Sequence, residues 1–355
     1  MAWYKFLNRD LVFFSLDKVA LLQIFFMKIQ LKSLLLHSVC AAALMLAGAG
    51  AGAADAGNVW VSSENDNNVI VFSVEGQQEA VIPTCRRPRH LAFSPNYTRL
   101  YVACGNSDAI GIIDVAQRKM VGEVPVGESP EIFALSNDGL IAYASIEDES
   151  ALIAYNLVSK KPLFRVATGA EPEGVLLSQD GSTAYVTSEV SNAVHVIDVT
   201  SRKQVSYIPV GKRPRRGVLT PDGKSLWVTN ELGASISVIH LATAQVSHTI
   251  GLRVQGLRAT DITPVGVVMN SAGTVAWVAL GRANRIARID VASKTITDLI
   301  LAGQRSWGLT LSPDEKRLYV TNGLSDDMTI IDAVTSKAIR TVPAGRVPHT
   351  VVLSP

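Results

Sequence analysis

Charged and aromatic side chains recur at one place in this sequence, just after the prolines that open successive segments of about 42 residues. Carboxylates here could act as bases, with guanidinium or imidazole groups stabilising an oxyanion. The same charges could instead bind an anionic ligand or a polar partner surface, or could form a solvated rim. The candidate residues, which we expect in the loops that join one segment to the next, are Arg89, His90, Glu131, Glu173, Arg215, Arg216, Trp307 and His349.

Motifs for other chemistries are missing from the sequence. It contains no CxxCH for haem, no GxSxG for a serine nucleophile and no phosphate-binding loop. Of the six histidines, only His90 and His349 are expected at the same rim, and two ligands rarely suffice for a closed metal site. We therefore expect no cofactor and no metal. The formal net charge of +2 argues against nucleic-acid binding through bulk charge.

A repeat organises the chain and must position these residues. Its anchor is an aromatic residue in segments such as LYVTN, AYVTS and LWVTN, and successive anchors are 41, 42, 42, 42, 50 and 42 residues apart. The anchors are Trp60, Tyr101, Tyr143, Tyr185, Trp227, Trp277 and Tyr319. Turn-forming residues, mostly Asp, Asn or Ser, stand thirteen positions after each anchor. The one long spacing indicates an insertion near residues 252–259.

Each repeat predicts four short antiparallel strands, exemplified by GVLLS, AYVTS, AVHVID and KQVSYIPV. Four strands in about 40–45 residues are typical of a propeller blade. The C-terminal HTVVLSP supplies only the first strand of a blade, and GNVWVSS, NVIVFSV and QQEAVIP near the N-terminus supply the other three. We expect an all-β, seven-bladed β-propeller whose ring closes by mixing N- and C-terminal strands in one blade.

The N-terminal 53 residues differ from the repeats. Met27 opens a segment with Lys28 and Lys32, an apolar run and a small-residue cleavage site at residues 51–53, which is typical of a secretory signal peptide. We expect a mis-called upstream extension at residues 1–26, a cleaved signal peptide at residues 27–53 and a propeller at residues 54–355 in the periplasm, with no membrane span after cleavage. A membrane anchor is the alternative, because residues 11–26 are also apolar.

The LYVTN-type segments, the SPDG-like turns and the VIDV runs resemble the YVTN-type β-propeller repeat family over residues 57–355. The chain looks most similar to exported propellers associated with catabolism that depends on pyrroloquinoline quinone (PQQ). The resemblance implies a periplasmic accessory role without established catalysis. Quinoprotein dehydrogenases themselves have eight blades, tryptophan-docking repeats and adjacent cysteines, so the chain should not be such an enzyme.

Two functions from different classes follow. The first is a non-catalytic binding or scaffold protein, with a protein partner or a small anionic ligand at the charged rim, accessory to a quinoprotein alcohol-oxidation system. The alternative is a lactonase-like hydrolase, because some lactone hydrolases share the seven-bladed fold. It would use Arg89, His90, Glu131 and Glu173 as base and oxyanion support.

Cys85 and Cys104 remain after the expected cleavage. An oxidising compartment favours a disulfide between them, which would join the last blade to the first beside the closure. Separate buried thiols, or a metal or redox use, are the alternatives.

Overall fold

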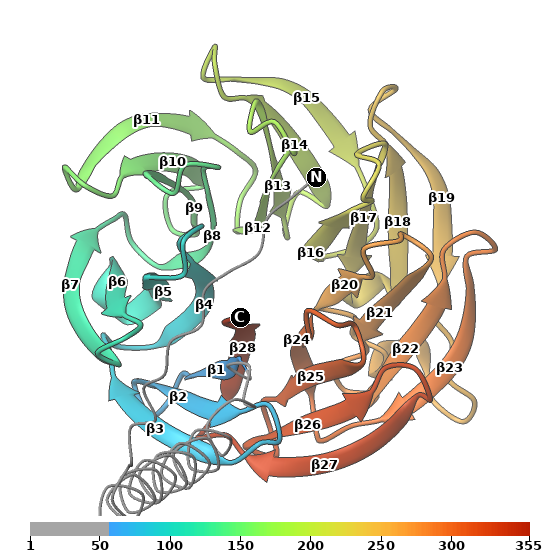
Figure 1. Cartoon of the computed structure of the whole chain (residues 1–355). Coiled ribbons are helices and arrows are strands. Elements are labelled where there is room, and N and C mark those ends of the chain that lie inside the picture. Colours follow the sequence, from blue (N-terminus) through green and yellow to red (C-terminus); the bar gives the residue numbers. More distant parts are fainter. Residues whose placement is uncertain (1–56) are drawn as a thin grey trace, which may run out of the picture. The chain divides into compact units, whose positions relative to one another are not determined.

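The computed structural model describes residues 57–355, which form a ring of seven sheets with four antiparallel strands each (Figure 1). The predicted seven-bladed β-propeller is therefore confirmed. The expected signal peptide and upstream extension lie outside the described residues. Within the described part of the chain, helical structure is limited to three short 3-10 turns, and none could cross a bilayer.

Every blade orders its strands from the channel outwards. The inner strands are β4 (Pro88–Phe93), β8 (Pro130–Leu135), β12 (Pro172–Leu177), β16 (Pro214–Leu219), β20 (Val267–Met269), β24 (Ser306–Leu311) and β28 (Pro348–Leu353). The second strands are β1 (Asn58–Ser63), β5 (Arg99–Cys104), β9 (Ile141–Ile146), β13 (Thr183–Ser188), β17 (Ser225–Asn230), β21 (Val275–Ala279) and β25 (Arg317–Asn322).

The third strands are β2 (Asn68–Ser73), β6 (Ala109–Asp114), β10 (Ala151–Asn156), β14 (Ala193–Asp198), β18 (Ser235–His240), β22 (Arg285–Asp290) and β26 (Asp327–Asp332). The outer strands are β3 (Gln78–Pro83), β7 (Lys119–Pro125), β11 (Lys161–Ala167), β15 (Lys203–Pro209), β19 (Gln245–Gly251), β23 (Thr295–Leu301) and β27 (Lys337–Pro343). The 3-10 turns are η1 (Gly105–Ser107), η2 (Glu231–Gly233) and η3 (Ala259–Asp261).

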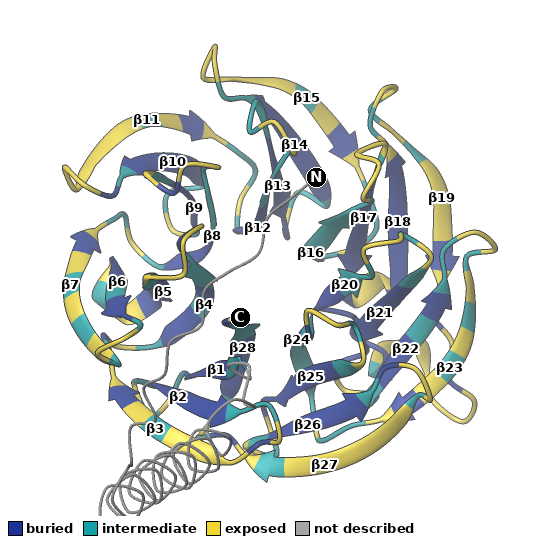
Figure 2. Ribbon diagram, viewed as in Figure 1, coloured by how far each residue is buried: buried dark blue, intermediate teal, exposed yellow. Residues whose placement is uncertain are grey.

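Burial follows the same radial order, with exposed outer strands and buried middle strands (Figure 2). The middle strands are apolar on both faces because each sheet packs against a neighbour on either side. Anchor aromatics fill the spaces between blades. Tyr185, for example, packs in one cluster with Leu226 and Val228 of the next blade.

The two chain ends meet in one blade, with strand order β28-β1-β2-β3. Trp60 pairs with Val352 and Val59 with Leu353. The amide of Ser354 donates a hydrogen bond to the carbonyl of Asn58 at 3.0 Å. The closure predicted from the sequence is confirmed.

A side-chain hydroxyl two residues after the anchor ties each of five blades to the next. Thr187 Oγ1 accepts a hydrogen bond from the amide of Gly174 in its own inner strand at 2.8 Å, and donates one to the carbonyl of Arg215 in the next blade at 2.7 Å. The equivalent residues in the other four blades are Ser62, Ser145, Thr229 and Thr321. Ala103 and Ala279 take this place in the remaining two blades. The hydroxyl that recurs in five repeats is thus a connection between neighbouring blades.

Removing residues 347–355 should strongly lower the melting temperature, because it deletes β28 and leaves β1 as an unpaired inner edge. Thermal denaturation followed by circular dichroism measures the effect. A chain lacking only the exposed Pro355 is the control and should melt like the full chain. An unchanged melting temperature for the longer truncation would refute the closure as a stabilising feature.

Substituting Thr187→Val should lower the free energy of unfolding by about 1–3 kcal/mol, because it leaves a buried amide and a buried carbonyl without partners. Urea denaturation measures the change. Thr249→Val is the matched control, since Thr249 lies exposed on outer strand β19. Equal effects of the two substitutions would contradict the role assigned to the hydroxyl.

Candidate ligand site at the channel mouth

Seven residues form a ring at one end of the channel, each directly after the proline, or its equivalent Ser306, that opens an inner-strand segment. This mouth ring comprises Arg89, Glu131, Glu173, Arg215, Val265, Trp307 and His349. Strand pairing shifts register directly after the proline, as between Pro88 and Leu91, and such bulges re-aim side chains. The next residues form a second ring, which comprises His90, Ile132, Gly174, Arg216, Gly266, Gly308 and Thr350.

The structure places the candidate residues on different elements from those expected from the sequence. They were expected in exposed connecting loops, but all eight lie on the inner strands themselves. Every mouth-ring residue except the half-buried Trp307 is only 1–7% exposed. A solvated rim therefore does not describe these residues, and their charges must be compensated within the protein.

In three blades, a side chain from the preceding loop holds the turn before the inner strand. Arg87, Arg213 and Arg305 have positive φ angles of 57°, 54° and 56°. The amide of each donates a hydrogen bond of 2.8–2.9 Å to the side-chain oxygen of an asparagine after the second strand, which is Asn67, Asn192 or Asn284. These contacts fix where the three guanidinium groups leave the backbone.

A cavity of about 290 Å³ opens at this mouth. Its lining mixes arginines and glutamates with one aromatic and one imidazole group. The lining residues are Glu64, Arg87, Arg89, Glu131, Glu147, Glu173, Glu189, Arg213, Arg215, Arg305, Trp307, Gly323, Val347, Pro348 and His349.

Ion pairs interleave the charges around the mouth. Arg89 Nη1 lies 2.5 Å from Glu131 Oε2. Arg215 contacts Glu173 at 3.1 Å, also forms an ion pair with Glu189, and lies 3.8 Å from Glu231. Opposite charges of neighbouring blades therefore lie beside one another around the mouth.

Burial and the guanidinium groups act in opposite directions on the carboxyl pKa values. Burial raises the pKa of Glu131 to about 8 and that of Glu189 to about 7, although the nearby arginines lower both. Burial also favours the neutral form of Glu173, but Arg215, Arg89 and Arg216 outweigh it and hold its pKa at about 2. Glu173 therefore stays ionised at neutral pH, whereas Glu131 and Glu189 take up protons more readily, so the mouth becomes more positive as the pH falls.

Trp307 and His349 form the uncharged side of the mouth. The guanidinium carbons of Arg305 and Arg215 lie 4.7 and 5.1 Å from the Trp307 ring centroid, within cation–π range. His349 Nε2 faces guanidinium nitrogens of Arg89 and Arg216 at 3.3 and 3.4 Å. Burial and these guanidinium groups hold the pKa of His349 well below its usual range, so Nε2 of the neutral ring accepts and Nδ1 donates to Thr350.

The structure divides the candidate residues between two cavities. Arg89, Glu131, Glu173, Arg215, Trp307 and His349 line the mouth cavity, whereas His90 and Arg216 line a second cavity further along the channel. The four residues considered for a hydrolase are therefore not gathered around one point. The glutamates Glu64, Glu189 and Glu231 complete the mouth, and they share one repeat position, four residues after the anchor aromatic.

No group of three or more His, Cys, Asp or Glu residues in the described range 57–355 is placed to hold a metal ion. The charged groups of the mouth engage one another instead.

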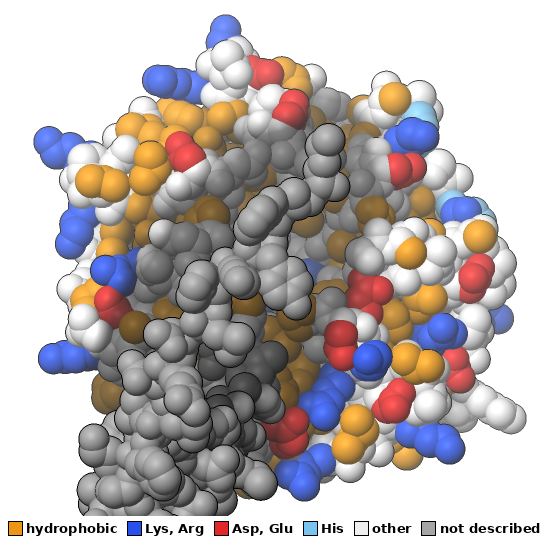
Figure 3. Space-filling model, in the orientation of Figure 1, with side chains coloured by type: hydrophobic (Ala, Val, Ile, Leu, Met, Phe, Trp, Pro, Cys, Tyr) orange, Lys and Arg blue, Asp and Glu red, His pale blue; other side chains and the backbone are white. Residues whose placement is uncertain are grey.

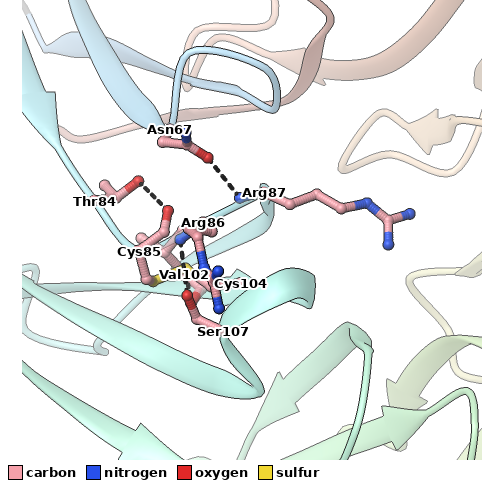
Figure 4. Close-up of a disulfide and its surroundings, with 8 residues drawn as sticks. All are labelled: Asn67, Thr84, Cys85, Arg86, Arg87, Val102, Cys104 and Ser107. Carbon is pink, nitrogen blue, oxygen red and sulfur yellow. Dashed lines mark hydrogen bonds between the residues drawn. A yellow bond between two sulfur atoms is a disulfide. The ribbon is translucent and has the colours of Figure 1, made fainter.

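Cys85 and Cys104 form a disulfide (Figure 4), with their Cα atoms 5.7 Å apart. Cys85 follows outer strand β3 of the closing blade, and Cys104 ends β5 of the next blade. Both are buried. Close by, Asn67 and Ser107 accept hydrogen bonds from the amides of Arg87 and Arg86. The disulfide thus joins two blades at the base of the Arg87 turn.

Replacing both cysteines by alanine should lower the free energy of unfolding by about 3 kcal/mol, as expected for a closed loop of roughly 20 residues. Denaturation of the oxidised protein and of the double variant measures this difference. Mass spectrometry after alkylation without reduction is the direct check. Two alkylated thiols in the exported protein would contradict the bond.

The fold and the mouth define a β-propeller whose channel entrance presents charged groups to a small cavity. The sequence model of the Choice-of-anchor I domain family matches residues 38–218, and the chain belongs to this family. Membership in it points to a secreted or surface protein. Comparison with curated protein sequences found no match.

Solved structures with similar folds include Kuenenia stuttgartiensis hydrazine synthase, at 22% identity and a TM-score of 0.69, covering 78% of this chain and 92% of that chain. A functionally unknown protein from Desulfotomaculum acetoxidans DSM 771 has 15% identity and a TM-score of 0.69, with 83% and 98% covered. Dihydro-heme d1 dehydrogenase NirN in complex with DHE has 16% identity and a TM-score of 0.65, with 85% and 76% covered. At these identities the likeness shows the fold alone.

Proposed function

We propose that this chain is an exported, non-catalytic β-propeller of the YVTN type that binds a small anionic ligand or a polar partner surface at its channel mouth. We further propose that it is a periplasmic accessory to PQQ-dependent alcohol catabolism. The geometry of the channel mouth supports the binding role. The sequence resemblance supports the link to quinoprotein catabolism.

Val265 carries the argument for binding. It occupies the same register as Arg89, Glu131, Glu173 and Arg215, and it is buried. The fold therefore accepts an apolar side chain in the mouth ring. Buried ion pairs contribute little stability compared with apolar side chains of similar size, so stability alone does not account for four charged residues in this ring.

The state of the charges favours an anionic ligand. Glu131 and Glu189 have pKa values raised to about 8 and 7, while the arginines beside them stay charged. A ligand carboxylate or phosphate could compete for these guanidinium groups with paired hydrogen bonds. Trp307 adds a flat apolar surface flanked by Arg215 and Arg305.

The partners of the ionisable groups support a role without catalysis. Glu131 contacts Arg89, and Glu173 contacts both Arg215 and Arg216. His349 Nε2 faces two guanidinium groups. A general base needs a lone pair directed at the substrate, whereas arginine guanidinium groups lie against each of these three side chains.

Deleting the gene from its source organism should slow growth on alcohols and leave growth on a non-alcohol carbon source unchanged. Wild-type protein should restore growth, whereas a Trp307→Leu, Arg305→Ala double variant should not. Lys203→Ala, on outer strand β15, is the control and should restore growth fully. Periplasmic fractionation of each variant verifies export and amount.

Two outcomes would overturn the proposal. Normal growth of the deletion strain on alcohols would end the accessory role. Turnover of a lactone panel by the purified protein, with or without divalent metal, would end the assignment as non-catalytic.

A further inference from the structure

A second cavity of about 300 Å³ lies along the channel, beyond the mouth ring. Most of its wall is glycine or aliphatic, and its polar lining comprises His90, Arg216, Thr310 and Thr350. The aliphatic lining residues are Ile132, Val175, Leu176, Val267, Leu309, Val351 and Val352. Leu176, Thr310 and Val352 are only half-buried, so their surface is open to the channel.

The space in this channel results from the packing of the backbone. Gly174, Gly266 and Gly308 occupy three of the seven second-ring positions. A Cβ at any of them would collide with the carbonyl oxygen of the mouth-ring residue in the next blade. Side chains cannot fill these three positions without displacing the neighbouring strand, so the channel stays wide on that side.

The guanidinium group of Arg216 carries a positive charge, and Arg216 lines this cavity. Its Nε lies 3.5 Å from Glu173 Oε1 without forming a hydrogen bond, and Glu173 is also held by Arg215 at 3.1 Å. Its remaining close partner is the neutral ring of His349. Burial lowers the pKa of Arg216 to about 10. Arg216 is therefore a partly buried cation that shares its carboxylate partner Glu173 with Arg215.

His90 adds an unused polar group beside Arg216. Its Nδ1 is buried without a hydrogen-bond partner, and its ring packs edge-to-face on Phe133 at 5.0 Å between centroids. Burial, reinforced by Arg216, lowers the pKa of His90 to about 3. The ring is neutral at physiological pH, and a neutral imidazole can donate one hydrogen bond to an anion.

We propose that this channel cavity is a second binding site, which takes a short aliphatic carboxylate with its head group at Arg216 and His90 and its hydrocarbon chain along the apolar wall. A carboxylate matches the paired donors of a guanidinium group. The aliphatic wall favours a hydrocarbon chain over a small hydrated anion such as phosphate. This site uses residues other than the mouth ring, so it does not depend on the function proposed for the mouth.

Isothermal titration calorimetry of the purified protein with acetate, butanoate, hexanoate, hexanol and inorganic phosphate tests the site. Affinity should rise about fourfold for each added methylene from acetate to hexanoate, because each buries apolar surface. Hexanol and phosphate should each bind at least tenfold more weakly than hexanoate.

Arg216→Met keeps the volume and removes the charge, and it should weaken hexanoate binding at least tenfold. Arg253→Met, at an exposed arginine of the insertion, is the matched control and should bind like wild type. Thr310→Phe narrows the lumen without changing charge. This substitution should weaken the binding of hexanoate more than the binding of acetate. It tests the proposal even if Arg216→Met does not fold.

Equal affinities for acetate, phosphate and hexanoate would overturn the proposal and indicate a simple anion site. Undiminished hexanoate binding by folded Arg216→Met, or by Thr310→Phe, would overturn it as well. The growth phenotype that tests the mouth is measured separately, so failure of one proposal leaves the other intact.

Discussion

The hydroxyl that joins neighbouring blades is the contact on which the rest of this propeller depends. In five blades, a bulge near the start of the inner strand leaves an amide without a partner in the sheet, and the serine or threonine of the second strand accepts its hydrogen bond. The same hydroxyl donates to the carbonyl of the mouth-ring residue in the next blade. One side chain therefore satisfies the bulge, fixes the angle between blades and positions the backbone of a functional residue.

Because the backbones of Arg89, Glu173 and Arg215 are fixed in this way, their side chains meet charged groups of other blades at fixed distances. Glu173 forms an ion pair with Arg215 of the next blade, and Arg89 forms one with Glu131 of the blade after its own. The buried charges are costly to desolvate, and arginines lie beside glutamates of neighbouring blades around the ring. Over the described surface seen in Figure 3, by contrast, acidic and basic side chains are mixed on exposed loops and strands. Among residues 57–355, burial moves carboxyl pKa values to about 7 and 8 only at the mouth.

The sequence predicted the architecture well and the site only in outline. The number of blades and their closure followed from the repeat of about 42 residues, its anchor aromatics and the complementary chain ends. These features could be read from the sequence because strand period and turn chemistry are local properties. The candidate list included every charged member of the mouth ring, since these residues follow the repeat prolines. It placed them in connecting loops, however, and it omitted Glu189 and Glu231 from the site. The bulge that brings the inner strands into the channel, and the convergence of side chains from three blades on Arg215, depend on contacts between residues that are distant in the chain.

By itself, the sequence determined what each repeat position must be. Turn residues, strand lengths, anchor aromatics and the prolines all follow from local backbone preference and from the need to bury both faces of every blade. The tertiary structure alone decided what differs between repeats. It paired Arg89 with Glu131, separated His90 and Arg216 from the mouth, and left an apolar channel where Gly174, Gly266 and Gly308 meet neighbouring carbonyls. The physical reason is that a repeat fixes where a residue lies along its own blade, whereas charge pairing and cavity shape depend on the distance between side-chain atoms of different blades.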